Sequence, residues 1–438
     1  MRFILLTFFV SFHALSYAAI RLPSIIGNNM VLQQQEKVRL WGWGEPGEKI
    51  SVVTSWNQNM DSTQANGNGK WQIFVQTPAA GGPFTITLKG QNKIVLENVL
   101  IGEVWICSGQ SNMEMNYNWG LPQMKEDFAS AKNPAIRFFH VTKTTADAPQ
   151  ENCEGSWIVC DSNSVKSFSA VAYYFGRKLN EGLHVPVGLI HASWSGTPAE
   201  AWTPDDMIYG NQVLLKASET LKSSQWWPVL PGLAYNGMIA PVTKFNIAGA
   251  ISYQGESNTG TASTYSQLLT TMIESWRKKW NKIFPFYLVQ IAPFNYGNNQ
   301  IGAELREAQT ATLSLTQTGM VVTTDLASDT NDIHPRNKRD VGYRLANLAL
   351  SKTYHVNRGE VESPVFDHME IDGNKIILSF QPTRAGLVSK DKVVKGFVIA
   401  GEDGIYHDAD AKIKNNQIIL SSKAVAHPVS VRYAFTNT

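Results

Sequence analysis

Ser111 lies in a setting where a serine could carry chemistry. It follows the short apolar strand pattern 104–107, in the segment Gly109-Gln-Ser111-Asn, and precedes a helix pattern. A serine hydroxyl becomes a good nucleophile when a base takes its proton and a further group orients that base. At a helix start, its backbone N–H also faces any anion formed during the attack. The alternative is that Ser111 only caps the helix, which this short motif favours by itself.

Three further positions follow predicted strands in a similar way. Gly196 and Gln254 each come directly after a strand pattern, and His334 lies in the loop after another. The carboxyl ends of parallel strands meet at one edge of a sheet, and the ligand crevice lies there. We therefore expect these three residues and Ser111 to gather at one end of a sheet.

The central part of the chain alternates between strand and helix patterns, which predicts a parallel sheet covered on both faces. The expected strands are 104–107, 185–192, 247–253, 286–291 and 320–325, and the expected helices are 168–179, 268–280, 304–315 and 336–354. From 22 to about 100, and again after about 358, short β-rich runs are separated by turn residues. These flanks predict two small β-domains, the first of them a sandwich.

The composition and the N-terminus indicate an exported globular protein. Of the 438 residues, 43% are hydrophobic and 17% charged, and the formal net charge is +2. No nucleic-acid partner is expected from this balance. Residues 1–18 combine a basic start, a short apolar run and small residues, which predicts a signal peptide. We expect no membrane span and a periplasmic or extracellular location, or a lysosomal one in a eukaryote.

The three cysteines fit no metal site, because they lack the C-x-x-C spacing. In an exported protein Cys153 and Cys160 are expected to close a small disulfide loop and to leave Cys107 free. Cys107 as a nucleophile is a weaker alternative to Ser111, because a cysteine in an apolar strand usually serves as a small hydrophobic residue.

Four segments of the chain stand out together: Gly102–Met113, Trp194–Trp202, Tyr253–Asn258 and Asp332–Lys338. In this order they resemble the sequence blocks of one hydrolase family, the sialate O-acetylesterase family of the SGNH hydrolase superfamily. Shorter similarities extend the resemblance over nearly the whole chain after residue 18, among them Met30–Gln33, Leu305–Gln309 and Val431–Tyr433.

The resemblance implies an SGNH-type, flavodoxin-like three-layer α/β/α catalytic domain at 101–357. The β-rich flanks would then form an N-terminal β-sandwich domain at 19–100 and a C-terminal β-domain at 358–438. It also implies a serine esterase that removes acetyl groups from a carbohydrate, sialic acid first of all, through an acyl-enzyme intermediate. No cofactor and no metal are implied.

The resemblance also assigns the catalytic roles. Ser111 would attack the acetyl carbonyl, and His334 would take the serine proton and return it to the sugar alkoxide. The backbone N–H groups of Ser111 and Gly196 would be two donors of the oxyanion hole. The superfamily places its acid three residues before the histidine, where this chain has Asn331. We expect Asp332 to orient His334 instead, with another carboxylate or a backbone carbonyl as alternatives.

The third block departs from the superfamily's Gly-x-Asn pattern, because this chain has Gly-Glu-Ser at 255–257. The side-chain amide of the oxyanion hole would then come from Gln254 or Asn258. We prefer Gln254, which stands at a strand end. Glu256 is expected to be a hydrogen-bond partner behind the reacting groups. Arg306 is expected to hold this loop or a substrate group, with a structural salt bridge as the favoured role.

Two other functions compete with sialate deacetylation. The first keeps the chemistry and changes the sugar to acetylxylan or another polysaccharide. Sialate carries a carboxylate that an arginine could bind, but the sequence does not single one out. The second is a non-catalytic carbohydrate-binding protein whose flanking β-domains would bind the sugar. It predicts a missing nucleophile or base, whereas Ser111 and His334 are both present.

Overall fold

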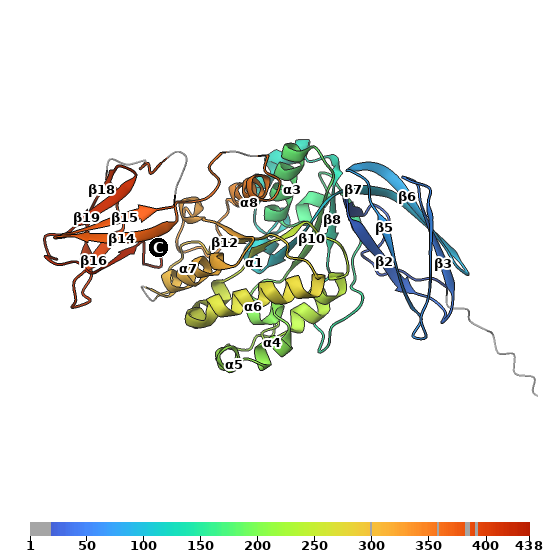
Figure 1. Ribbon diagram of the computed structural model, residues 1–438, viewed down its shortest axis with the longest axis horizontal. Coiled ribbons are helices and arrows are strands. Elements are labelled where there is room, and N and C mark those ends of the chain that lie inside the picture. Colours follow the sequence, from blue (N-terminus) through green and yellow to red (C-terminus); the bar gives the residue numbers. More distant parts are fainter. Residues whose placement is uncertain (1–18, 298–299, 357–358, 382–385, 390–392) are drawn as a thin grey trace, which may run out of the picture.

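The computed structural model describes residues 19–297, 300–356, 359–381, 386–389 and 393–438. The predicted signal peptide at 1–18 therefore lies outside the described residues. A central part made of helices and strands lies between an N-terminal and a C-terminal β-region (Figure 1). Among the described residues, no helix is both long and apolar enough to cross a lipid bilayer.

The central part is built on one sheet with the strand order β13-β12-β11-β7-β10-β8-β9. Neighbouring strands are parallel, except that β9 runs antiparallel to β8. The strands are β7 (Lys93–Gly109), β8 (Asn133–His140), β9 (Trp157–Cys160), β10 (Val187–Ser193), β11 (Gly249–Tyr253), β12 (Phe286–Val289) and β13 (Thr318–Val321). β10 and β11 are buried along their whole length, as strands covered on both faces must be.

Long helices cover both faces of this sheet. α3 (Ala170–Leu183) packs against α8 (Lys338–Lys352), and α6 (Ala262–Trp280) packs against α7 (Ile301–Ala311). The two pairs lie on opposite sides of the sheet (Figure 1). This three-layer arrangement confirms the predicted α/β/α fold class.

Short helices fill the connections. The α-helical ones are α1 (Ser111–Glu114), α2 (Ser164–Ser167), α4 (Asp205–Tyr209) and α5 (Gln212–Ser218). The 3-10 turns are η1 (Tyr117–Trp119), η2 (Pro122–Ser130), η3 (Ala199–Trp202), η5 (Ala240–Val242), η6 (Glu256–Thr261), η7 (Thr312–Ser314) and η8 (Thr324–Leu326), and η4 (Tyr235–Ile239) is a π-helical turn. The strand expected at 320–325 ends at Val321. The side-chain hydroxyl of Thr323 then donates to the carbonyl of Gln290, and the 3-10 turn η8 follows.

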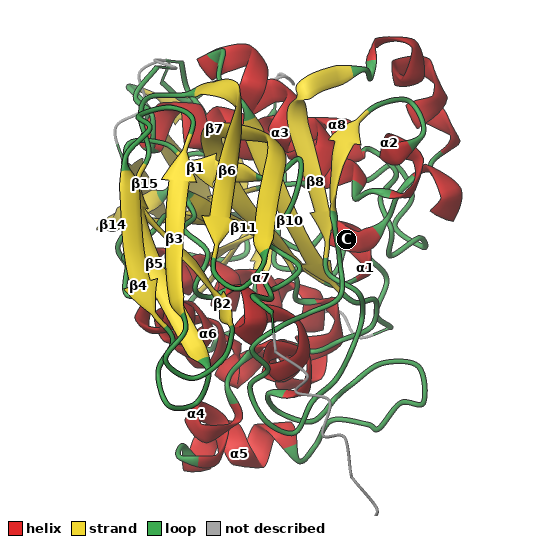
Figure 2. Cartoon of the chain, turned by 90° about the vertical axis from the view of Figure 1, so that its right-hand side faces the viewer, coloured by secondary structure: helices red, strands yellow, loops and turns green. Residues whose placement is uncertain are grey.

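The described part of the N-terminal region contains six strands before β7. They are β1 (Val31–Gln33), β2 (Lys37–Trp43), β3 (Lys49–Thr54), β4 (Met60–Gln64), β5 (Lys70–Gln76) and β6 (Gly81–Lys89). β3, β4 and β6 form antiparallel pairs that continue onto β7, β1 pairs parallel with β7, and β2 and β5 form a separate antiparallel pair. β6 pairs with the first half of β7, and β10 and β11 pair with its second half. Figure 2 looks onto these strands, with the central sheet and its helices behind them. The expected boundary at residue 100 thus falls within one continuous strand, and the division into domains stays a prediction.

The C-terminal region contains two small antiparallel sheets around a core of its own. One has the order β14-β15-β19-β18 and the other β17-β16-β20. The strands are β14 (Phe366–Asp372), β15 (Lys375–Phe380), β16 (Phe397–Ala400), β17 (His407–Asp408), β18 (Asp410–Lys414), β19 (Gln417–Ser421) and β20 (Ser430–Tyr433). The last residues return to the central part, where Arg306 on α7 donates to the carbonyls of Ala434, Thr436 and Asn437.

The predicted disulfide is wrong, because Cys153 and Cys160 are both free and buried. Cys153 packs into the core shared with the N-terminal strands, whereas Cys160 packs on the opposite face of the sheet, beside α3. Its Sγ lies 3.1 Å from the carbonyl oxygen of Ala131. The two thiols point into different cores, so a seven-residue spacing along the chain does not bring them together.

Candidate active site

Three neighbouring strands end at the same level and place three of the predicted residues together. Gly109 at the end of β7 is in register with Ser193 on β10 and with Tyr253 on β11. Ser111, Gly196 and Gln254 follow these strand ends within a few residues. The chain leaves β7 for β8 on one side and later crosses to β11 on the other, so this is the sheet's topological switch point, where α/β proteins bind ligands.

Two glycines let the backbone segments approach one another here. Gly109 has φ +141°, and a Cβ added to it would lie 2.1 Å from the carbonyl oxygen of Tyr253. Gly196 has φ +79°, and its added Cβ would lie 2.3 Å from the nearest ring atom of Trp227. Only glycine fits both positions without a shift of its neighbours.

Ser111 is the first residue of α1 and is 5% exposed. Its carbonyl accepts from the N–H of Met115, which holds the short helix. Among the described residues, neither its hydroxyl nor its N–H makes a hydrogen bond, and the N–H of Gly196 makes none either. Two backbone donors and one hydroxyl are therefore available to a bound acyl group.

His334 lies in the loop between η8 and α8, with its side chain about one-third exposed. Its Nδ1 is 3.8 Å from Oδ1 of Asp332, beyond hydrogen-bond range, and the same oxygen accepts from the His334 backbone N–H at 2.9 Å. Burial lowers the pKa of His334, the charge of Lys338 lowers it further, and Asp332 opposes them. The neutral ring, which can accept a proton, thus prevails near neutral pH.

Ser111 and His334 lie on adjacent segments without a direct hydrogen bond between their side chains. Asn112, next to Ser111, donates from Nδ2 to the carbonyl of Ile333, next to His334, at 3.0 Å. Catalytic hydrogen bonds are often long without substrate and tighten when it binds. The segments that carry Ser111 and His334 are thus joined by a hydrogen bond between their neighbouring residues, Asn112 and Ile333.

The two candidate amides differ in their free donors. Both N–H groups of Asn258 are engaged, because Nδ2 donates to Glu200 at 2.8 Å and to Thr261 at 3.3 Å. Gln254 donates to Asn258 Oδ1 at 2.9 Å, and its other contacts, to Gln110 Oε1 and Thr197 O, are 3.4 and 3.5 Å long. Gln254 therefore has an N–H donor whose hydrogen bonds are long and weak.

The remaining predicted residues lie behind these groups. The Glu256 carboxylate is buried and accepts from Asn112 at 2.6 Å, and its second oxygen has no partner. Burial raises the pKa of Glu256. The salt bridge expected for Arg306 is wrong over the described residues, because its guanidinium donates instead to three backbone carbonyls of the C-terminal segment.

Glu114 is a residue that the sequence interpretation missed. It stands three residues after Ser111, and its carboxylate accepts from the N–H of Ser195 at 2.7 Å and pairs with Lys143. It thereby fixes the loop that carries Gly196. The i, i+3 spacing from Ser111 was the only available signal, since residues three apart share one face of a helix.

Tryptophans surround the site on two sides. The Trp119 ring lies 5.9 Å from the His334 ring, between centroids. On the other side, the Trp227 ring lies against Gly196, and Trp194 donates to the carbonyl of Trp226, whose side chain is 71% exposed. Such rings stack well on the C–H faces of sugars. Over the residues that the structure describes, no group of three or more His, Cys, Asp or Glu side chains is arranged to hold a metal ion.

The chain is similar to known carbohydrate esterases. The model of the family "Carbohydrate esterase, sialic acid-specific acetylesterase" matches residues 101–351. Sialate O-acetylesterases of Homo sapiens and Pongo abelii are each 30% identical over 398 residues, which covers 82% of this chain and 76% of theirs. The crystal structure of a carbohydrate acetylesterase from Xanthomonas citri is 33% identical with a TM-score of 0.84, and the match covers 96% of this chain and 95% of that one.

Proposed function

Because the chain belongs to the sialic acid-specific acetylesterase family of carbohydrate esterases and is a carbohydrate O-acetylesterase, we propose that Ser111 and His334 remove acetyl groups from sialic acid. One observation carries the catalytic assignment. The Ser111 hydroxyl, its N–H and the N–H of Gly196 all stand unused at the switch point of the sheet. The roles below are those that this arrangement supports best.

In the acylation step His334 Nε2 takes the proton of Ser111 as Oγ bonds to the acetyl carbonyl carbon. The carbonyl oxygen becomes an oxyanion that accepts from the N–H groups of Ser111 and Gly196. The C–O bond to the sugar then breaks, and the alkoxide takes the proton from His334. Water, activated by the same ring, hydrolyses the acetyl-serine and releases acetate.

For the third oxyanion donor we propose Gln254 over Asn258. One N–H group of Gln254 makes only long hydrogen bonds, whereas both N–H groups of Asn258 are engaged. Asp332 would orient His334, because Oδ1 is the carboxylate oxygen beside Nδ1 and a modest rotation would close the 3.8 Å gap. Glu256 supports the reacting groups indirectly, through its hydrogen bond with Asn112. Arg306 anchors the chain end and takes no part in the reaction.

Arg336 is the observation that favours sialate. It stands two residues after His334 with its side chain 61% exposed, and one of its nitrogens donates to the carbonyl of Gly120, the neighbour of Trp119, at 2.7 Å. Its Nε lies 3.8 Å from Asp332. Among the described residues, Nη2 makes no hydrogen bond. Guanidinium groups bind carboxylates through paired donors, and the adjacent Trp119 ring offers a face for the sugar.

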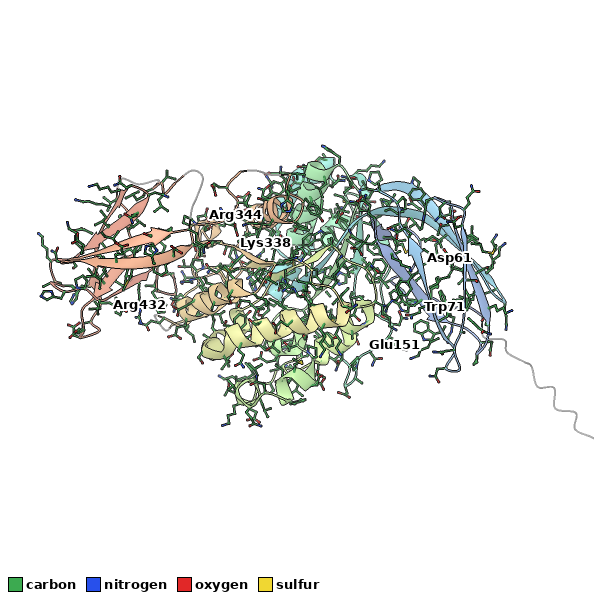
Figure 3. All side chains as sticks on the ribbon, viewed as in Figure 1. Asp61, Trp71, Glu151, Lys338, Arg344 and Arg432 are labelled. Atoms are coloured by element: carbon green, nitrogen blue, oxygen red, sulfur yellow. The ribbon has the colours of Figure 1, made fainter. Side chains whose placement is uncertain are left out.

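The test compares a charged and a neutral substrate. Arg336→Gln should raise KM about 10- to 100-fold for O-acetylated N-acetylneuraminate, the range expected for hydrogen bonds to a charged group. At a pH above the ordinary histidine pKa of about 6.5, where the His334 ring is neutral in both enzymes, it should leave p-nitrophenyl acetate hydrolysis unchanged. Arg432→Gln, in the C-terminal β-region (Figure 3), is the matched control and should alter neither. Equal KM values for the parent and Arg336→Gln would refute carboxylate binding by Arg336, and with it the observation that favours sialate. The activity of Ser111→Ala tests the catalytic assignment separately, and an active Ser111→Ala would refute that assignment.

A second candidate substrate is a neutral acetylated polysaccharide such as acetylxylan. The exposed Trp226 and Trp119 favour it, because indole rings stack on uncharged pyranoses. The solved relative from Xanthomonas citri is described as a carbohydrate acetylesterase without a charged sugar in its name. Acetate release from acetylxylan at a kcat/KM above that for O-acetylated sialate would favour this candidate.

We also infer that the protein is exported to a periplasmic or extracellular location, or to a lysosome if its host is eukaryotic. The support is the basic and apolar pattern of residues 1–18. The mature protein should begin near Ala19. Mass spectrometry of the secreted or periplasmic protein checks this, and an intact Met1 on the functional protein would contradict it.

A further inference from the structure

The side chain of Asn112 joins four segments beneath the reacting groups. Its Nδ2 donates to Glu256 Oε1 at 2.6 Å and to the carbonyl of Ile333 at 3.0 Å, and its Oδ1 accepts from Lys338 Nζ at 2.5 Å. Both N–H donors of the amide and one acceptor site of its oxygen are therefore used. Asn112 itself has no exposed surface.

These contacts link elements that are remote in the sequence. Asn112 follows Ser111 on α1, Glu256 begins η6 after β11, Ile333 precedes His334, and Lys338 begins α8. Within the part of the chain that the structure describes, the bond from Asn112 to the Ile333 carbonyl is the one hydrogen bond between residues 109–114 and residues 327–337. The backbone of the His334 loop is thus tied to the nucleophile's segment at a single point.

The bridge also carries buried charge. Lys338 is 1% exposed and lies in the central part of the molecule (Figure 3), with its ammonium 5.3 Å from the centre of the Tyr253 ring. Glu256 is also buried, and each of the two groups contacts the Asn112 amide from its own side. Leaving one buried charge without the other is costly, so the amide has a defined orientation between a donor and an acceptor.

We propose that Asn112, held between Glu256 and Lys338, is a positioning residue that fixes the His334 ring relative to the Ser111 hydroxyl through the Ile333 carbonyl. The inference rests on the proposed roles of Ser111 and His334. It is independent of which sugar carries the acetyl group. Glu256 and Lys338 act through Asn112 and contact no reacting atom.

Lys338 adds an electrostatic effect on the same base. Its charge lowers the pKa of His334, together with burial and Arg336, while Asp332 raises it. Glu256 and Asp332 favour the charged form of Lys338 against the larger effect of burial, which lowers its pKa to about 7. Replacing Lys338 by an uncharged side chain of similar length should therefore raise the pKa of His334.

Asn112→Ala tests the positioning role. It should lower kcat for p-nitrophenyl acetate by about 10²-fold, the order expected when a reacting group is misplaced by about 1 Å, with little change in KM. Asn180→Ala is the matched control, because its Nδ2 also donates to a backbone carbonyl, that of Val185 at 2.7 Å, on α3 away from the site. It should keep the parental kcat. An Asn112→Ala enzyme with full kcat per folded molecule, whatever its Tm, would overturn the proposal.

Lys338→Met supplies a readout that a purely structural role would not move. The acid limb of its kcat/KM–pH profile should lie at higher pH than that of the parent enzyme. An unmoved limb, or one shifted to lower pH, would contradict the role of Lys338. If Asn112→Ala does not fold, Asn112→Asp decides by the same kcat criterion, because it keeps the acceptor of Lys338 and loses the donors to Glu256 and Ile333.

Ser111→Ala, measured in parallel, separates the two levels of the hypothesis. An active Ser111→Ala refutes the catalytic assignment itself. An inactive Ser111→Ala together with a fully active Asn112→Ala refutes the positioning role alone.

Discussion

Replacing Gly196 by alanine tests the oxyanion hole directly. Gly196 has φ +79°, and an added Cβ would lie 2.3 to 2.6 Å from three atoms of the Trp227 ring. Carbon atoms in contact prefer about 3.5–4.0 Å. The Gly196 loop or the Trp227 ring must therefore move by about 1 Å or more, judged against that contact distance.

A shift of this size is enough to take the Gly196 N–H out of the hole. Loss of one oxyanion donor lowers kcat by about 10²–10³-fold, or about 2.7–4 kcal/mol. KM should change less, because the N–H is needed most when the carbonyl oxygen becomes charged. The left-handed backbone adds strain of about 1–2 kcal/mol, so the Tm should also fall.

The assay is the initial rate of p-nitrophenyl acetate hydrolysis, normalised to folded protein. Gly260→Ala is the matched control, because nothing lies within 4 Å of its added Cβ. Trp227→Ala combined with Gly196→Ala removes the clash but keeps the strained φ, so it should recover part of the lost kcat. A Gly196→Ala enzyme with the kcat of the Gly260→Ala control would refute the assignment of Gly196 as a donor.

The remaining predictions concern the supports of the site. Glu114→Ala should lower kcat about 10-fold or more, because the loop of Gly196 loses the anchor at Ser195; steady-state kinetics beside Glu126→Ala, an exposed control, measure this. Asp332→Asn should cost far less than the roughly 10⁴-fold loss known for a buried triad acid, because the carboxylate stands 3.8 Å from Nδ1; a 10⁴-fold loss in kcat would contradict this. The acid limb of the kcat/KM–pH profile should have its midpoint below the ordinary histidine pKa of about 6.5, because burial and Lys338 lower the pKa of His334 and the ring stays neutral to lower pH; a midpoint above that value would contradict the direction. Arg306→Ala should lower the free energy of unfolding by about 1.5–3 kcal/mol, the value for hydrogen bonds to a charged group, because three carbonyls of the C-terminal segment lose their donor. Urea unfolding measures this change, and unchanged stability would show that Arg306 does not anchor the segment.

The strand ends of the catalytic part could be predicted from the sequence, and the orientation of its side chains could not. An apolar run that ends in a polar turn marks the point where a strand leaves the core. Ser111, Gly196 and Gln254 were placed correctly at strand ends for this reason. The family resemblance added the α/β/α fold, which is confirmed.

Side-chain partners escaped the sequence because they depend on which segments meet in space. Asn112 contacts Glu256 and Lys338, 144 and 226 residues further along the chain. Nothing in a local pattern distinguishes such an amide from a solvated one. The same limit explains the cysteine error, since a short spacing between Cys153 and Cys160 does not reveal that the two thiols face different cores.

The site thus consists of two parts with different mechanical support. Ser111 and Gly196 follow buried parallel strands in register, so the sheet fixes their separation. His334 stands in a loop, and its carboxylate neighbour Asp332 already accepts a hydrogen bond from the loop's own backbone. Such an oxygen stabilises the turn more directly than it orients the ring. The position of His334 then depends on the buried amide of Asn112 beneath it, and its basicity depends on burial and on Lys338 as well as on Asp332. In our proposal an esterase with its acid two residues before the histidine keeps its base in place through two supports, Asp332 beside the ring and Asn112 beneath the loop.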